Sequence, residues 1–369
     1  MKSQFAQRFG RLINTKMRSR TMLFSLLLIL ISCVELSAQI GGKHSFEFLN
    51  LTQSSRVTAL GGALISVIDN DINLGYANPA SLNKEMHFEI SFNHNFHFAD
   101  ISHGFAVGGY YHEKSKTTFQ LGFNYVNYGN FTRADILGNI NGEFSSGESA
   151  ITIGAGRLIN ERIRAGVNIK YINSSFDIFR ASGVAADIGL SYKNPESNVT
   201  VALVARQIGT TLSSYTGQTE SLPFDLQLGV SKRFKYLPFR FSATAHHLHQ
   251  WTLRLDEADQ SDPINFLGGE TVQQSPISKG LDNLFRHFVF NGEFLIGEQE
   301  QFKLRIGYNH MRRKELSVSE FRSLGGLSFG IGFKISKFRL DYGLGYYHLA
   351  GAVNHLSFSL NLASFTKKI

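Results

Sequence analysis

Residues 301–309 read QFKLRIGYN, and apolar side chains alternate in them with polar or small ones. Successive side chains of a β-strand point to opposite sides, so this order gives one apolar and one polar face. The apolar face holds Phe302, Leu304, Ile306 and Tyr308, and the other holds Lys303, Arg305, Gly307 and Asn309. The stretch therefore predicts a strand that separates two different surroundings.

Fourteen runs of this kind follow one another toward the C-terminus, most of them about ten residues long. A tilted strand needs ~9–11 residues to cross a bilayer, and single-chain bacterial outer-membrane barrels have an even number of strands. We predict an all-β protein, a transmembrane antiparallel 14-stranded β-barrel in the bacterial outer membrane. The runs span residues 88–98, 102–111, 117–126, 149–157, 162–173, 182–192, 198–207, 224–232, 239–253, 284–296, 301–309, 326–334, 338–347 and 354–365.

The connections between these runs support the barrel, because outer-membrane barrels have short periplasmic turns and longer outer loops. Short connections are predicted at 158–161, 193–197, 233–238, 297–300 and 335–337, and longer ones fall between them at 127–148, 208–223, 254–283 and 310–325. Both ends of the barrel are then periplasmic.

The longest connection, 254–283, is the predicted contact surface for a partner outside the cell. Its candidate residues are Asp256, Glu257, Asp259, Asp262, Gly268 and Gly269.

The first 38 residues have the order of a secretory signal peptide: basic residues, the apolar run Met22–Val34 and small residues up to Ala38. Cleavage is expected after Ala38, which removes Cys33, the one cysteine of the sequence. Three alternatives stay open: translation from Met17, lipidation of Cys33, and a retained membrane helix, for which a run of about 13 residues is short.

The leader also accounts for most of the basic charge. Residues 1–38 hold six cations and one anion, which leaves 31 Lys and Arg against 28 Asp and Glu. The net charge of +8 thus gives no reason to expect a nucleic-acid partner, which would need cations gathered on a folded face.

Residues 39–85 show little two-fold alternation and are predicted to form a hatch that plugs the barrel formed by 86–369. A fourteen-strand ring is wider than barrels that wall side chains can fill, so a plug would cover its inward polar groups. The predicted hatch motif is Gly61, Gly62, Asn78 and Pro79, with Asn78-Pro79 as the turn into the first strand. The alternative is a periplasmic tail.

The hatch segment resembles known proteins. NPA at 78–80, Leu82 and ALGG at 59–62 resemble the hatch of FadL-type barrels for long-chain fatty acids, which have fourteen strands. More narrowly, FEFLNL at 46–51, SRVTALGG at 55–62, ISV at 65–67 and NPA at 78–80 resemble the PorQ family of the type IX secretion system. Ser81 departs from the PorQ pattern, in which an aliphatic residue is expected.

The PorQ resemblance implies a subunit of the cell-surface attachment complex, which holds a PorZ-like surface protein and works with PorU-like and PorV-like subunits. It implies no catalytic residues, and neither a cofactor nor a metal is predicted. The FadL resemblance implies an alternative, a channel for hydrophobic small molecules. A soluble secreted β-sandwich, including a secreted enzyme, remains a third possibility, because sandwich strands alternate too.

Three patterns suggest chemistry at first sight. Gly326–Gly330 fits the G-x-S-x-G pattern of serine hydrolases, but that elbow needs a strand-to-helix turn, and Ser328 lies within an alternating run. His247 and His249 would share a strand face, although no third metal ligand can be assigned. Inward Arg164, Lys170, Lys303 and Arg305 could bind anions, or could pair with the plug.

Overall fold

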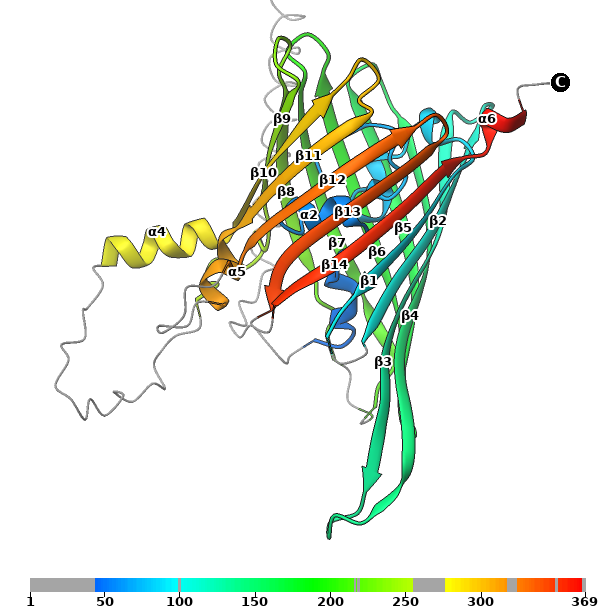
Figure 1. Cartoon of the computed structure of the whole chain (residues 1–369), viewed down its shortest axis with the longest axis vertical. Helices are drawn as coiled ribbons and strands as arrows, with labels where there is room; N and C mark the ends of the chain where they lie inside the picture. Colours follow the sequence, from blue (N-terminus) through cyan, green and yellow to red (C-terminus); the bar gives the residue numbers. More distant parts are fainter. Residues whose placement is uncertain are drawn as a thin grey trace, which may run out of the picture. The chain divides into compact units, whose positions relative to one another are not determined.

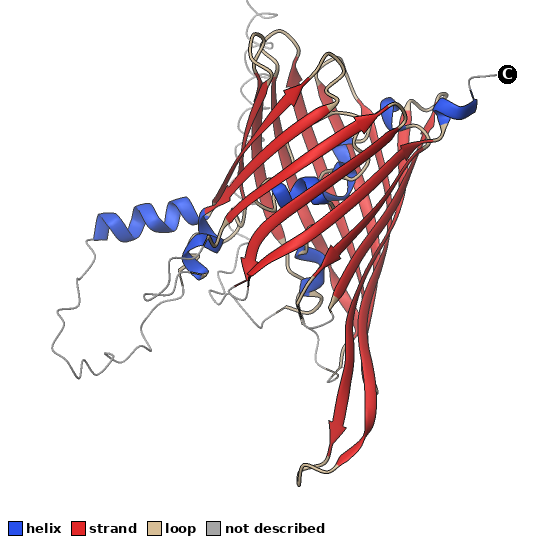
Figure 2. Cartoon of the chain, viewed as in Figure 1, coloured by secondary structure: helices blue, strands red, loops and turns tan. Residues whose placement is uncertain are grey.

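The described part of the computed structural model, residues 44–98, 101–215, 217, 220–254, 276–316, 324–348 and 351–366, forms fourteen antiparallel strands (Figures 1 and 2). The predicted leader and the six candidate residues of the 254–283 loop lie outside these residues. The strands are β1 (Glu89–Phe96), β2 (Ser102–His112), β3 (Thr117–Ala134), β4 (Ile140–Leu158), β5 (Ile163–Phe176), β6 (Phe179–Asn194), β7 (Val199–Ser213), β8 (Asp225–Arg233), β9 (Phe239–Ala245), β10 (Phe288–Ile296), β11 (Phe302–Asn309), β12 (Leu327–Ile335), β13 (Phe338–His348) and β14 (Gly351–Asn361).

The sheet closes on itself. Each strand pairs with its neighbours in the sequence, and β1 pairs with β14 in the register Ile90↔Leu360 and Phe92↔Phe358. Closure gives every described strand two hydrogen-bonding partners, which the hydrocarbon core of a membrane requires. The predicted fold class is confirmed, and the sandwich is wrong.

Outward positions are apolar and inward positions are polar. In β3, Phe119, Leu121 and Phe123 are 41%, 61% and 45% exposed, whereas Gln120 and Asn124, which lie on the other face, are buried. Soluble monomers do not expose a continuous apolar belt around a whole barrel. This outer face is therefore built for lipid.

The two ends of the barrel differ. At one end all the turns are short, from the two residues 336–337 up to the five of 234–238. The other end carries the long connections, but also short ones such as 177–178 between β5 and β6. The prediction of short turns thus holds at the periplasmic end. The prediction of long loops holds for only some of the outer connections, because two strands can also be joined by a tight turn at the outer end.

Three outer connections also contain more regular structure than predicted. The predicted loop 127–148 is largely strand, since β3 and β4 continue as a hairpin past the other strands (Figure 1). Helices α4 (Pro276–Arg286) and α5 (His310–Glu315) precede β10 and follow β11, while α6 (Ala363–Thr366) follows β14. No helix among the described residues is long and apolar enough to cross a membrane.

The N-terminal segment lies inside the barrel as short helices (Figure 2). These are η1 (Glu47–Asn50), α2 (Ser55–Ala59), α3 (Leu74–Ala77), η2 (Pro79–Ser81) and η3 (Lys84–Met86). Helices of three to five residues are unstable alone, so they depend on packing against the wall. Both Leu60 and Leu82 are fully buried, and the plug rather than the periplasmic tail is confirmed for residues 44–85.

Candidate functional site

A buried cluster of charges joins the hatch to the wall; we call it the hatch lock. At its centre is Arg56 of α2, whose side chain is 3% exposed. Its guanidinium donates to Glu293 of β10 through Nε and Nη2, both at 2.9 Å, to Asp69 at 2.8 Å and to Asp71 at 3.1 Å. Arg56 thus holds an acidic turn of the hatch and a wall carboxylate together.

Three wall arginines complete the hatch lock. Arg240 of β9 lies 3.1 Å from Asp69 and 2.8 Å from Glu293. Arg305 of β11 pairs with Glu293 at 3.1 Å and with Asp341 of β13 at 2.6 Å. Arg339 of β13 pairs with Asp71 at 3.1 Å and with Glu89 of β1 at 2.7 Å. The hatch is therefore connected to β1, β9, β10, β11 and β13 by one network.

A second buried ion pair lies on the other side of the lumen. Lys170 of β5 and Asp187 of β6 are both fully buried and 2.7 Å apart, and the Lys170 ammonium lies 4.2 Å from the ring centre of Tyr76 in α3. Asn168 of β5 donates to the carbonyl of Gly75 at 3.0 Å. The hatch is thus held from two directions.

These contacts decide between the two interpretations of the inward cations. Lys170 pairs with Asp187, and Arg305 with Glu293 and Asp341. Arg164 donates to the hatch carbonyls of Ala80 and Leu82 at 3.2 and 2.8 Å, and Lys303 lies 3.4 Å from Glu300. The cations face the plug and wall carboxylates, so the free anion site is not formed.

The predicted glycines lie where the hatch meets β11 and β12. Both have positive φ, +81° at Gly61 and +93° at Gly62, which suits glycine. The Gly61 amide donates to Ser328 Oγ at 2.8 Å, and the same hydroxyl donates to the Ala59 carbonyl at 3.0 Å. Ser328 lies in β12, in contact with the hatch, and the strand-to-helix elbow of a hydrolase is absent there.

Asn78 and Pro79 have a different place from the one predicted. The Asn78 side chain donates to the Ile65 carbonyl at 2.6 Å and to Ser191 of β6 at 3.0 Å, and accepts from the Ala80 amide at 2.9 Å. It caps η2 against the wall. The chain reaches β1 only after η3, so the prediction of Asn78-Pro79 as the exit turn is wrong.

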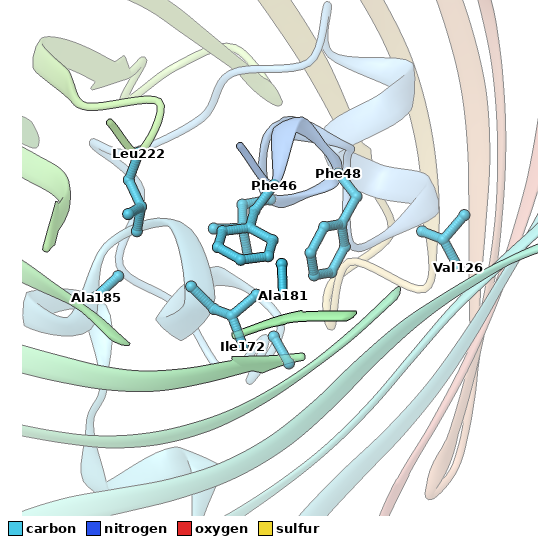
Figure 3. Packing of buried hydrophobic residues seen from close by; sticks show 9 residues of the cluster. Phe46, Phe48, Val126, Ile172, Ala181, Ala185 and Leu222 are labelled. Carbon is cyan, nitrogen blue, oxygen red and sulfur yellow. The ribbon is translucent and has the colours of Figure 1, made fainter. Parts of the chain in front are cut away.

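The outward end of the hatch is apolar. Phe46, just before η1, and Phe48, within it, pack against Val126, Ile172 and other wall residues (Figure 3). Phe46, Phe48 and Ile172 are 4%, 3% and 0% exposed. The lumen is thus filled by apolar side chains toward the outside and by ion pairs deeper in.

At the periplasmic end the lumen opens into polar cavities. One of about 510 Å³ is lined by Asp69 and Arg240 of the hatch lock and by turn residues such as Arg233 and Glu300. A neighbouring cavity of about 480 Å³ also includes Asp69 and Arg164. The hatch is therefore open to the periplasm through these cavities.

The histidine pattern does not form the predicted strand face. β9 ends at Ala245, two residues before His247, which has φ +54°. The Nδ1 atoms of His246 and His247 are 2.5 Å apart. Among the residues that the structure describes, no cluster of three or more metal-ligating side chains occurs.

A hairpin formed by the ends of β3 and β4, residues 127–147, is the longest outer feature among the described residues; we call it the outer hairpin. A crossing strand needs about ten residues, and β3 and β4 have 18 and 19, so both project beyond the bilayer. Its tip exposes Ile136 at 102%, Leu137 at 82% and Ile140 at 72%. An ion pair from Arg133 to Asp177, in the β5–β6 turn, steadies it.

Comparison with known proteins identifies the fold of the chain but not a sequence family. No protein-family model matches the chain, and no curated protein matches it by sequence. Among solved structures, the CymD monoaromatic hydrocarbon channel aligns with a TM-score of 0.51 and 14% identity, covering 85% of this chain and 98% of CymD. The chain has this barrel fold.

Two further barrels align more loosely. The toluene transporter TodX of Pseudomonas putida gives a TM-score of 0.47 at 11% identity, over 84% of this chain and 96% of that one. A FadL homologue of Pseudomonas aeruginosa gives 0.45 at 10%, over 84% and 98%.

The apolar belt and the fourteen-strand closure together place the protein in the bacterial outer membrane. This agrees with the FadL-type barrel that the hatch sequence implies.

Sequence reasoning missed the hatch lock. It placed Arg305 on the inward face, but did not connect the wall with Arg56 or with the acidic turn of Asp69 and Asp71. The available signal was a set of charged residues at inward positions of consecutive strands, opposite a hatch of mixed charge. A lumen that must bury those charges needs partners for them.

Proposed function

We propose that this protein is a sealed outer-membrane anchor that holds a cell-surface protein through its outer hairpin. The observation that carries the proposal is the tip formed by Ile136, Leu137 and Ile140, which is apolar and lies beyond the lipid belt. Exposed apolar clusters in water favour binding to another protein. The PorQ resemblance of the hatch supports a role in the type IX attachment complex, with a PorZ-like partner.

The hatch lock supports a scaffold rather than an open pore. Moving the plug would separate Arg56 from Glu293 of the wall, and the hatch carboxylates of Asp69 and Asp71 from the wall arginines that they contact. All of these side chains are less than a fifth exposed. Breaking a buried charge network by separating its partners costs about 3–5 kcal/mol. A barrel closed in this way anchors a partner without opening a leak.

Replacing both Ile136 and Leu137 by aspartate is expected to weaken capture of the PorZ-like protein about 30-fold, because central apolar contacts of an interface contribute ~2 kcal/mol. The measurement is retention of that protein on the surface of intact cells, against its release into the medium. Heat-modifiable migration of the barrel checks that it is assembled.

The matched control is Tyr236→Asp. Tyr236 is 89% exposed like the hairpin tip, but it lies in the β8–β9 turn at the periplasmic end. We expect normal retention. Full retention by the hairpin double variant would refute the proposed docking surface.

A second candidate is passage of hydrophobic small molecules. It is favoured by the fold, which is that of a monoaromatic hydrocarbon channel, and by the apolar cluster of Phe46, Phe48 and Ile172 at the outer end of the lumen. In this case the hatch would have to move.

Uptake of a radiolabelled aromatic hydrocarbon by cells with and without the gene tests the second candidate. A channel predicts that uptake falls in the deletion strain and that Phe48→Ala changes its rate. The anchor predicts equal uptake in both strains, with loss of the surface protein only.

A further inference from the structure

Helix α4 has its apolar stripe on the outside. Ile277, Leu281, Leu284 and Phe285 lie at positions i, i+4, i+7 and i+8, which form one face of a helix about 100° wide. Their exposures are 77%, 52%, 38% and 46%. A helix on a water-soluble protein turns such a stripe toward the core, so this arrangement is inverted.

The polar side of α4 is fixed to the protein. Asp282 lies 3.0 Å from Arg286, 3.1 Å from Lys314, 3.3 Å from His310 and 3.4 Å from Arg254. Burial by itself would raise the pKa of Asp282, but hydrogen bonds from Arg286, Lys314 and His310 outweigh it and lower the pKa to about 2. The carboxylate therefore stays charged at neutral pH and holds α4 against α5.

Asn283 fixes the same side of α4. Its side chain accepts from the Leu253 amide at 2.9 Å and donates to the Trp251 carbonyl at 2.7 Å. With Asp282 and Asn283 both engaged, the helix cannot rotate to bury Leu281 without breaking these contacts.

The apolar stripe continues into the lipid-facing wall. α4 ends at Arg286, two residues before β10 begins with Phe288, which stacks on Phe290 at 5.8 Å between ring centres. Phe288, Phe290, Phe294 and Ile296 occupy the alternate positions of β10, and the last two are exposed on the lipid side. Phe285 lies three residues before Phe288 in the sequence, and its ring is 5.9 Å from that of His310 in α5, so the stripe reaches the outer end of β10.

Trp251 lies beside α4, at the same end of the barrel. It is the one tryptophan of the sequence, 67% exposed, with its ring 6.1 Å from that of His287. Tryptophan and other aromatic side chains concentrate where outer-membrane barrels meet the headgroup region.

We propose that α4 is an interfacial helix that lies in the outer leaflet, with Ile277, Leu281, Leu284 and Phe285 inserted among the lipids. The occupant of the stripe is lipid, because the stripe is continuous with a surface already facing lipid. Amphipathic helices bind membranes in this way, with the apolar face among the acyl chains and cations on the opposite side. Lys279 lies on that opposite side of the helix. The inference depends on the barrel's place in the membrane and not on the proposed partner.

The test compares two single-cysteine variants of the full-length chain, Leu281→Cys and Lys279→Cys, in a Cys33→Ser background. Each is labelled with an environment-sensitive fluorophore and reconstituted into liposomes that carry spin-labelled lipid. No other protein is present, so a protein partner cannot protect the label.

We expect lipid-borne quenching at position 281 to exceed that at 279 at least about twofold, since one side chain points into lipid and the other into water. Iodide in the buffer should give the reverse order. Equal quenching of both positions by lipid, or greater access of iodide to position 281, would overturn the proposal and leave the stripe to a protein partner.

The unmodified chain provides a second measurement that no substitution can disturb. Brominated lipids should quench the emission of Trp251 in the same liposomes. Emission unchanged by brominated lipid would show that this rim lies outside the leaflet, and would contradict the proposal.

Discussion

Arg56→Ala is expected to lower the free energy of unfolding by about 3–5 kcal/mol, the usual cost of removing one partner from a buried charge network. The variant leaves Asp69, Asp71 and Glu293 in place without the guanidinium that joins them. Arg240, Arg305 and Arg339 still contact these carboxylates, so the barrel should fold while the hatch loosens.

Two measurements check the effect of Arg56→Ala. Urea unfolding in lipid vesicles gives the free energy, and sensitivity of cells to a large antibiotic such as vancomycin reports whether the lumen leaks. The free energy of unfolding should fall and the sensitivity to vancomycin should rise together, because the hatch lock joins α2 of the plug to the wall.

The control is Arg162→Ala. Arg162 also pairs with a carboxylate, Glu196 at 3.6 Å, but their side chains are 49% and 80% exposed. Exposed ion pairs contribute about 0–1 kcal/mol, so this variant should unfold almost normally and should not leak. An Arg56→Ala protein as stable and as tight as the control would mean that the hatch lock does not hold the plug.

Most of the wall could be predicted from the sequence. Period-two alternation is a local property, and in stretches such as 301–309 it fixes both the strand and the face of each side chain. The errors fall where the alternation and the strand end at different residues. Residues 246–253 continue the alternation past Ala245, but the chain turns at His247, whose backbone leaves the strand region.

The site was less predictable, because it depends on contacts between distant residues. Arg56 and Glu293 are 237 positions apart, and only the closed ring brings β10 to the hatch. The candidate residues of the 254–283 loop, Asp256 to Gly269, lie outside the described residues, so that contact surface stays a prediction. The inverted stripe of α4 was hidden for a different reason: a short amphipathic pattern does not say which of its faces meets the protein.

Gly307→Ala is expected to destabilise the hatch by about 1–3 kcal/mol, the range for adding a methyl group to a closely packed site. A Cβ at this position of β11 would lie 2.2 Å from the Gly61 nitrogen and 2.4 Å from the Leu60 carbonyl carbon. Both are backbone atoms, so no side-chain rotation relieves the clash. The turn must move away, and it then loses the bond from the Gly61 amide to Ser328.

Gly108→Ala is the matched control in β2. A Cβ there would meet its nearest atom at 3.9 Å, which is ordinary contact, and alanine restricts the unfolded chain more than glycine does. We therefore expect the opposite sign, a gain of about 0.4–1 kcal/mol in the same urea titration. Protease cleavage of the hatch in folded barrels distinguishes a loosened hatch from an effect on the unfolded chain. Cleavage should increase with Gly307→Ala and should not change with Gly108→Ala. Equal protection in both variants would show that Gly61 does not need the close approach of β11.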